Sequence, residues 1–243
     1  MPNPGSGPNT GSTIQSVAQH LATVKNDIAQ FERTYGRSEG SVKLLAVSKT
    51  KPASLVREAA SEGQIDFGEN YVEEGVAKRS ELDDLDAAWH YIGHIQSNKT
   101  RVITAHYDWV QSVDRLKIAG RLAQHRSPEQ APLNICIQLN IDDEESKSGC
   151  SVAELEPLAE FVDSSPTLIL RGLMAIPAPR TEPDQQRKVF ARLHSLYQTL
   201  QSEYKAVDTL SMGMSGDMEA AIAEGATMVR IGTAVFGARQ KRL

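Results

Sequence analysis

The fold is decided by the stretch LLAVSKTKP, residues Leu44 to Pro52. Its first four residues form an apolar run, which predicts a buried β-strand. Pro52 suits the first turn of a helix, and a helical pattern continues to Ser61. An open nucleotide-binding α/β sheet normally has a glycine-rich turn directly after its first strand. No glycine lies between Val47 and Pro52, so this stretch disfavours a doubly wound sheet.

Short apolar runs alternate with helical patterns along the rest of the chain. With the first run they predict eight strands, at residues 44–47, 65–67, 89–92, 109–113, 135–139, 168–174, 209–212 and 228–231. Helix candidates between them include residues 52–61, 115–125, 152–162 and 185–204. Strands that alternate with helices predict a parallel sheet, and eight such units predict a closed (β/α)8 barrel of the TIM type.

An additional helix is expected before the first strand, because apolar residues from Ile14 to Phe31 recur at helical spacing. Residues 1–12 are rich in Pro, Gly, Asn, Ser and Thr, a composition that predicts a loose, disordered tail. The chain has 243 residues, about the length of one α/β barrel. We therefore predict a single barrel domain over residues 13–243, with an extra N-terminal helix.

Composition and charge argue against a nucleic-acid-binding, membrane-spanning or secreted protein. The formal net charge of -5 argues against a general electrostatic grip on nucleic acid, which needs basic surface. No stretch approaches the roughly 18 consecutive apolar residues of a membrane span. The first residues lack the apolar segment of a secretory signal, so we expect a cytoplasmic protein without membrane association. No sustained apolar stripe lies outside the barrel pattern, which favours a monomer.

The cysteines and histidines do not suggest a metal site. Cys136 and Cys150 are the only cysteines, and their contexts differ, so we expect inert thiols rather than a disulfide or a metal pair. His90 and His94 flank a predicted strand with no matching cluster of further ligands. We expect packing or hydrogen-bonding roles for both histidines and no bound metal.

Lys49 is the first candidate for chemistry, because it follows an apolar strand at the end where barrels place their sites. Partial burial there can lower the pKa of its amine and let it form a Schiff base. A solvated surface lysine is the alternative interpretation. Lys51 is the rival amine, but it precedes Pro52 at a helix start and is expected to point toward solvent.

Glycine-rich segments after the last two predicted strands suggest a phosphate site, which barrels often form there. Ser215 either caps the following helix or faces a phosphate, and Gly232-Thr233 offers a second close backbone approach with a hydroxyl. Arg230 lies in an apolar strand and needs a partner, either a carboxylate or a cofactor atom. A lysine amine, a phosphate cradle and a partner for a pyridine nitrogen are what pyridoxal 5′-phosphate requires.

Several motifs occur in order from about Lys43 to Arg239 and resemble one family. They are LAVSK (45–49), FGEN (67–70), WHYIGHIQSNK (89–99), LSMGMSGDMEAAI (210–222) and MVRIGTAVFGAR (228–239). In these motifs the chain resembles the pyridoxal phosphate homeostasis proteins, which are similar in fold to the N-terminal barrel of alanine racemases, the fold type III of pyridoxal phosphate proteins.

The resemblance implies a role for each candidate residue. It implies a covalent aldimine of the cofactor on Lys49 and phosphate contacts from Ser215, Gly232 and Thr233. Arg230 is expected near the pyridine nitrogen, and Asn70 on the side of the ring hydroxyl. An arginine leaves the pyridine nitrogen largely unprotonated, which weakens the ring as an electron sink.

The family implies a protein that stores, buffers or delivers the cofactor without robust catalysis, with cofactor-dependent apoenzymes as the partners. The main alternative is an amino-acid racemase, which would need a second base from a further domain that we do not expect after Leu243. A third possibility is a barrel that binds another phosphorylated metabolite, for which Lys49 would be dispensable.

Overall fold

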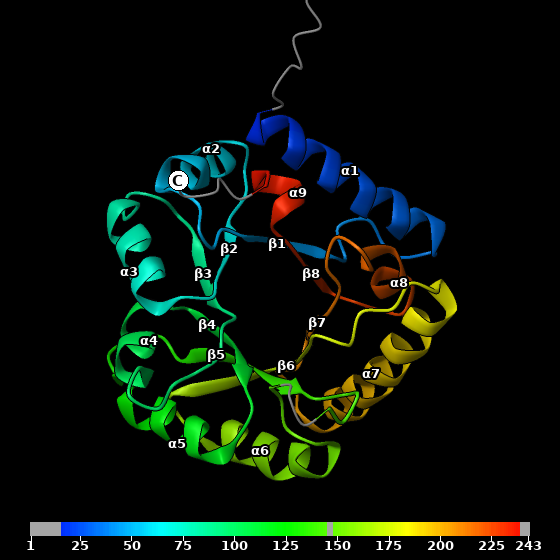
Figure 1. Cartoon of the computed structure of the whole chain (residues 1–243). Helices are drawn as coiled ribbons and strands as arrows, with labels where there is room; N and C mark the ends of the chain where they lie inside the picture. The colour runs from blue at the N-terminus through cyan, green and yellow to red at the C-terminus, as the bar shows by residue number, and fades with distance from the viewer. Residues whose placement is uncertain (1–15, 145–147, 239–243) are drawn as a thin grey trace, which may run out of the picture.

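Eight parallel strands close into a barrel in sequence order, with β8 pairing back to β1 (Figure 1). The computed structural model describes residues 16–144 and 148–238. The strands are β1 (Lys43–Val47), β2 (Asp66–Glu69), β3 (Ala88–Tyr91), β4 (Trp109–Val113), β5 (Leu133–Leu139), β6 (Leu168–Ala175), β7 (Thr209–Ser211) and β8 (Met228–Ile231). The predicted (β/α)8 barrel is confirmed.

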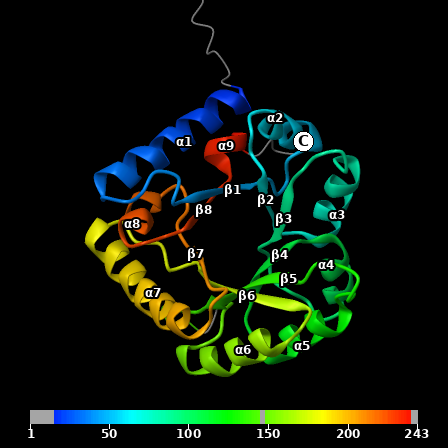
Figure 2. The ribbon, with the colours of Figure 1, turned by 180° about the vertical axis from the view of Figure 1, so that it is seen from behind.

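Helices form a ring outside the strands, as seen from either end of the barrel (Figures 1 and 2). They are α1 (Val17–Thr34), α2 (Ala53–Ser61), α3 (Val72–Glu81), α4 (Thr100–His106), α5 (Leu116–His125), α6 (Val152–Ser164), α7 (Pro183–Glu203), α8 (Met218–Ala223) and α9 (Thr233–Phe236). The core fills the space between ring and strands, where apolar side chains of both are buried. This two-layer packing explains why most strand residues are apolar.

The predicted extra helix is α1, which lies across the outside of β1 and β8 next to α8 and α9 (Figure 1). Its buried residues Val17, Leu21, Val24 and Ile28 form one stripe at helical spacing. Ser16 caps its first turn in a capping box with Gln19, so the helix begins at residue 17. The predicted start at residue 14 lies outside the described residues.

Element boundaries differ from the predicted ones by a few residues. Strand β2 starts at Asp66 rather than Ile65, whose side chain is 57% exposed. Pro52 is the N-cap of α2 rather than its first helical residue. The predicted tail (1–12) lies outside the described residues, and the limits of the single domain (13–243) remain a prediction.

Both cysteines are buried thiols, as expected, and burial raises the pKa of Cys150 to about 12. In residues 16–144 and 148–238, no cluster of three or more His, Cys, Asp or Glu side chains could hold a metal ion. None of the helices in this described part has the length and apolar character needed to cross a bilayer.

Candidate functional site

Lys49 lies on a tight turn at the carboxyl end of β1. The turn is closed by a hydrogen bond from Lys51 N to Ser48 O of 3.0 Å, while Ser48 N donates to Gly68 O on β2. Thr50 has φ of +63°, a left-handed conformation that a threonine seldom adopts and that other contacts must hold in place. Lys49 is half-buried in this turn.

A buried charged cluster holds the residues on both sides of Lys49. Lys78 on α3 donates to Ser48 O (2.6 Å), to Glu69 Oε1 (2.7 Å) and to Glu74 Oε1 (2.7 Å). Ser48 Oγ donates to Glu69 Oε1 over 2.6 Å, and Thr50 N donates to Glu74 Oε1. The chain before and after Lys49 is therefore fixed to β2 and α3 at the carboxyl end of β1, which lies at the mouth of the barrel.

Glu69 is the most deeply buried member of this cluster, with 0% exposure. Burial raises the pKa of its carboxyl group, and the charge of Lys78 and the hydrogen bonds from Lys78 and Ser48 oppose that rise only in part. Its Oε2 has no hydrogen-bond partner within the described residues. Glu69 lies in the FGEN motif, where the sequence predicts no role for it. Lys78 is not predicted as a site residue, because Glu74 and Lys78 have the spacing of an ordinary surface ion pair.

The prediction that Lys51 points toward solvent is wrong. Its Nζ donates to the carbonyl oxygens of Phe236 (3.0 Å), Gly237 (2.7 Å) and Ala238 (2.8 Å) at the end of α9. Helix carbonyls at a C-terminus lack intrahelical donors and attract a cation. The amine of Lys51 thus binds the carbonyl oxygens at the end of α9.

Arg230 is almost fully buried, with 4% exposure. Its Nη1 donates to Ser211 O (2.7 Å) and Ser211 Oγ (2.9 Å), and its Nη2 donates to Ala175 O (2.8 Å). Within the described residues Arg230 forms no ion pair with a carboxylate, so the first of its two predicted partners, a carboxylate, is not found. Burial lowers the pKa of its guanidinium to about 10, which leaves it charged at neutral pH.

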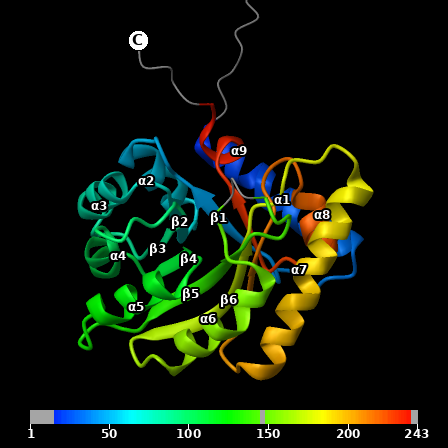
Figure 3. The same cartoon turned by 60° about the horizontal axis from the view of Figure 1, so that its bottom comes forward.

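Gly232 is the N-cap of α9 and Thr233 is its first residue. This short helix follows β8 (Figure 3). A Cβ on Gly232 would lie 3.2 Å from the carbonyl oxygen of Val47, which is a close approach between the ends of β8 and β1. Thr233 is exposed and opens the first turn of α9, where backbone N–H groups lack helical acceptors. These two residues therefore lie at the same edge of the barrel as Lys49.

Ser215 lies in the connection between β7 and α8, and it is exposed. The N-cap of α8 is Asp217, whose Oδ1 accepts from Met214 N over 2.6 Å, so Ser215 is not the helix cap. Ser215 instead lines a cavity of about 550 Å³ between α1, α7 and α8. Its predicted contact with a phosphate remains a prediction.

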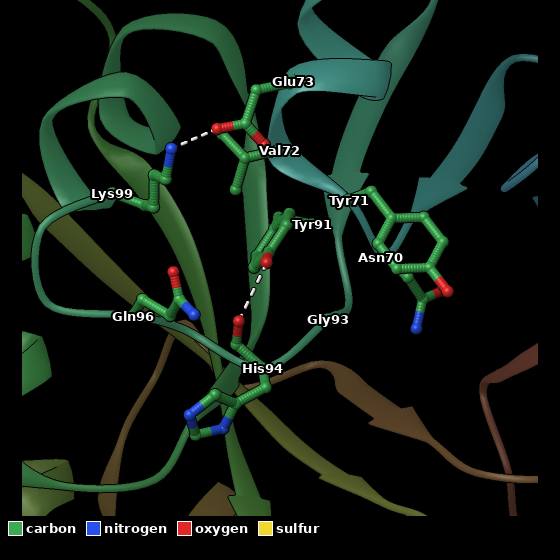
Figure 4. A pocket seen from close by; sticks show the side chains of 9 residues that line it. All are labelled: Asn70, Tyr71, Val72, Glu73, Tyr91, Gly93, His94, Gln96 and Lys99. Atoms are coloured by element: carbon green, nitrogen blue, oxygen red, sulfur yellow. Dashed lines mark hydrogen bonds and ion pairs between the residues drawn. The ribbon is translucent and has the colours of Figure 1, made fainter.

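Asn70 follows β2 and lines a cavity of about 390 Å³ at the mouth (Figure 4). A Cβ on Gly93 would lie 2.1 Å from Asn70 O, so only glycine allows the loop after β3 to approach this closely. The Oδ1 of Asn70 is buried and has no partner within the described residues. An unpaired acceptor beside Lys49's strand fits a ligand that brings a hydroxyl donor, as the ring of pyridoxal phosphate does.

The two histidines have different environments. His90 is fully buried and stacks on Trp109 with ring centroids 5.0 Å apart, so its predicted packing role is confirmed. His94 is exposed at the cavity wall, and its carbonyl oxygen accepts a hydrogen bond of 2.9 Å from the Tyr91 hydroxyl (Figure 4). Lys99 and Glu73 also line this cavity and form an ion pair, so the positive charge of Lys99 is partly balanced by the carboxylate of Glu73.

The closed barrel and the site at the carboxyl ends of its strands place this protein in the class of the alanine racemase N-terminal domain. The family model of that domain matches residues 19–240. Alanine racemase of Corynebacterium glutamicum has the same fold, with 17% identity, a TM-score of 0.65 and coverage of 90% of this chain and 61% of the racemase. At that identity the likeness concerns the fold alone.

More similar proteins carry one common name. The pyridoxal phosphate homeostasis protein of Pseudomonas aeruginosa is 54% identical over 226 residues, covering 93% of this chain and 97% of the relative. That of Escherichia coli K12 is 52% identical over 229 residues, covering 93% and 98%. The structure of PipY from Synechococcus elongatus with PLP bound is 36% identical, has a TM-score of 0.78, and covers 91% of this chain and all of PipY. The chain belongs to the pyridoxal phosphate homeostasis protein family.

Proposed function

We propose that this protein binds pyridoxal 5′-phosphate at the barrel mouth and takes part in its homeostasis, storing, buffering or delivering the cofactor. The observation that carries the proposal is the turn at Lys49, which is half-buried and held on both sides by Lys78, Glu69 and Glu74. Family membership and the PLP-bound structure of PipY support it. Lys51, the rival amine, donates to carbonyl oxygens at the end of α9 instead of pointing toward solvent.

Each predicted site residue has a defined part in this proposal. Lys49 would hold the cofactor through a C=N bond between its Nζ and the aldehyde carbon, formed with loss of one water molecule. Ser215, Gly232 and Thr233 would bind the phosphate, and Asn70 Oδ1 would accept from the ring hydroxyl. Arg230 would face the pyridine nitrogen. The bound cofactor supplies electron withdrawal from groups attached through that C=N bond.

We propose that the protein does not catalyse a reaction efficiently. Arg230 remains a cation, so it donates to the pyridine nitrogen and leaves that nitrogen unprotonated, which limits carbanion stabilisation. We propose a cytoplasmic monomer that passes the cofactor to apoenzymes that depend on it. An amino-acid racemase is the second candidate, favoured only by the shared barrel of alanine racemases.

Borohydride reduction tests the proposal. The protein is incubated with the cofactor, its visible absorption is recorded, and reduction is followed by mass analysis of the peptides. We expect a visible band that borohydride removes, with the phosphopyridoxyl mass on Lys49. Lys49→Ala should abolish the label, whereas Lys51→Ala should retain it. A label on Lys51, or none on the wild type, would refute the proposed site.

A further inference from the structure

A line of buried polar side chains crosses the interior of the barrel and ends at Arg230. It consists of Asp66 on β2, His90 on β3, Gln111 on β4, Ser211 on β7 and Arg230 on β8. The three middle residues have 0% exposure, and only 13% of the Asp66 side chain is exposed, at the amino end of its strand. We call this line the polar relay.

The contacts of the polar relay are continuous. His90 Nε2 lies 3.0 Å from Asp66 Oδ1, and His90 Nδ1 lies 2.9 Å from Gln111 Nε2. Ser211 Oγ donates to Gln111 Oε1 over 2.7 Å and accepts from Arg230 Nη1 over 2.9 Å. Strands β4 and β7 are not neighbours in the barrel, so the Gln111 side chain bridges opposite walls.

When His90 is neutral, the donor and acceptor atoms of these side chains allow the hydrogen bonds of the polar relay to run in one direction only. An amide nitrogen only donates, so Nδ1 of His90 accepts from Gln111 and Nε2 carries the proton. That proton faces the carboxylate of Asp66, which only accepts. The amide oxygen of Gln111 only accepts, so Ser211 gives it the hydroxyl proton and keeps a lone pair for Arg230. Every donor therefore points from Arg230 toward Asp66.

Burial favours this neutral form of His90, because desolvation lowers the pKa of its ring, although Asp66 opposes the shift. A doubly protonated His90 would need Gln111 to turn its amide oxygen toward Nδ1. Its amide nitrogen would then face Ser211 Oγ, which already accepts from Arg230. The orientation of Gln111 thus determines how Ser211 can bind Arg230, and dipoles aligned along such a chain strengthen one another.

We infer that the polar relay positions the Arg230 guanidinium, so that Asp66 at the opposite end of the line affects how Arg230 meets the cofactor ring. The part of this inference that concerns the cofactor rests on the proposed function. Asp66, His90 and Gln111 are positioning residues, since they act on the cofactor through Arg230 and Ser211.

The first experiment needs no cofactor. Protein with isotope-labelled histidine and arginine is studied by NMR as the wild type, Asp66→Asn and Gln111→Leu. The His90 and Arg230 signals are assigned by their loss in His90→Gln and Arg230→Lys. We expect His90 to be neutral with its proton on Nε2, and both test variants to shift the Arg230 side-chain signals. Unchanged Arg230 signals in both folded variants would overturn the relay.

Thr104→Val is the matched control. Thr104 on α4 has 0% exposure and its hydroxyl donates to Arg101 O, so the variant removes a buried polar group that contacts no member of the polar relay. It should lower stability without moving the Arg230 signals. Thermal unfolding of each variant shows whether it is folded. If Gln111→Leu does not fold, the nearly isosteric Asp66→Asn alone tests whether a change in the polar relay shifts the Arg230 signals.

The second experiment measures release of the cofactor from the loaded protein. Gln111→Leu removes the two hydrogen bonds that Gln111 makes within the polar relay. If the part of this loss that reaches Arg230 is on the order of one neutral hydrogen bond, release should be roughly threefold to tenfold faster, with a shifted visible band, whereas Thr104→Val should match the wild type. A wild type with no borohydride-sensitive band would refute the proposed function and leave the apo NMR result standing. Equal release and equal bands in both variants, with a normal wild type, would refute the positioning of Arg230 alone.

Discussion

Lys78 Nζ donates a 2.6 Å hydrogen bond to Ser48 O, so an ammonium on α3 holds the peptide that precedes Lys49. The same ammonium binds Glu69 and Glu74, whose carboxylates contact Ser48 Oγ and Thr50 N. One buried cation therefore organises the turn from both sides. The N–H of Thr50, a residue in the left-handed conformation, donates to Glu74, which Lys78 also binds.

Lys78→Met should destabilise the fold by about 3–5 kcal/mol, because it leaves the buried carboxylate of Glu69 without its counterion. Urea unfolding followed by circular dichroism measures this change. Lys117→Met, on an exposed part of α5, is the control and should lie within about 0.5 kcal/mol of the wild type. Adding Glu69→Gln to Lys78→Met should recover part of the loss. If Lys78→Met were as stable as Lys117→Met, the charged cluster around Lys78 would not contribute to the stability of the fold.

Glu69→Gln tests the direction of the pKa shift. Because the pKa of Glu69 is raised in the folded protein, its contribution to stability is complete below pH 4.5 and is lost as pH rises through the folded pKa. The free energy of unfolding of Glu69→Gln, relative to the wild type, should therefore improve as pH increases above 4.5. Urea titrations at several pH values give this difference. A difference that worsened with rising pH would mean that Lys78 lowers the pKa.

Gly93→Ala should destabilise the protein by about 2–4 kcal/mol, since the new Cβ would lie 2.1 Å from Asn70 O and the backbone must move. Gly120→Ala is the matched control, because Gly120 is within α5 and its Cβ would meet Phe161 at an ordinary 3.7 Å. That change should stabilise the helix by about 0.5–1 kcal/mol. Thermal unfolding compares the two, and equal effects would contradict the tight packing at Asn70.

The barrel could be predicted from the sequence because most strand residues are buried and most of those are apolar. Leu44 to Val47 is wholly apolar, Met228 to Ile231 is apolar except for Arg230, and both runs are strands. Lys49 and Arg230 could be singled out because a lysine at a strand end and an arginine inside a strand are costly without a role.

The remaining site could not be predicted, because it depends on contacts across the fold. Gln111 and Ser211 are about 100 positions apart, and only the closed barrel brings their side chains together. Lys51 has the local features of a solvent-facing residue, yet the last residue of α9 and the two residues after it supply three carbonyl acceptors. Asp217 rather than Ser215 caps α8, since the helix starts later than its sequence pattern.

Ser215→Ala tests the phosphate cradle. If Ser215 binds the phosphate, the loss of one charge-assisted hydrogen bond should weaken cofactor binding by about 1.5–3 kcal/mol, roughly 10- to 150-fold in Kd. Equilibrium dialysis measures Kd directly. Ser202→Ala, on the exposed end of α7, is the control and should bind as the wild type does. Stability should be unaffected, because Ser215 is exposed and is not the cap of α8; unchanged binding would remove Ser215 from the site.

The protein should not act as an efficient racemase. Inversion requires a proton to leave one face of the substrate and return on the other, so two positioned acid/base groups are needed, and Lys49 supplies one. Arg230, buried and still cationic, limits carbanion stabilisation through the pyridine nitrogen, so removal of even one proton should be slow.

Amino acids in deuterated water test both requirements in one experiment. L- and D-alanine are incubated with the loaded protein, the loss of the α-proton signal is followed by NMR, and the enantiomers are separated afterwards. We expect slow exchange with retention of configuration, and none in Lys49→Ala. Exchange with inversion at about 1 per second or faster would be enzyme-like turnover and would establish the racemase instead. Arg230→Glu should accelerate exchange but not inversion, because a carboxylate lets the pyridine nitrogen keep a proton while the second acid/base group is still missing.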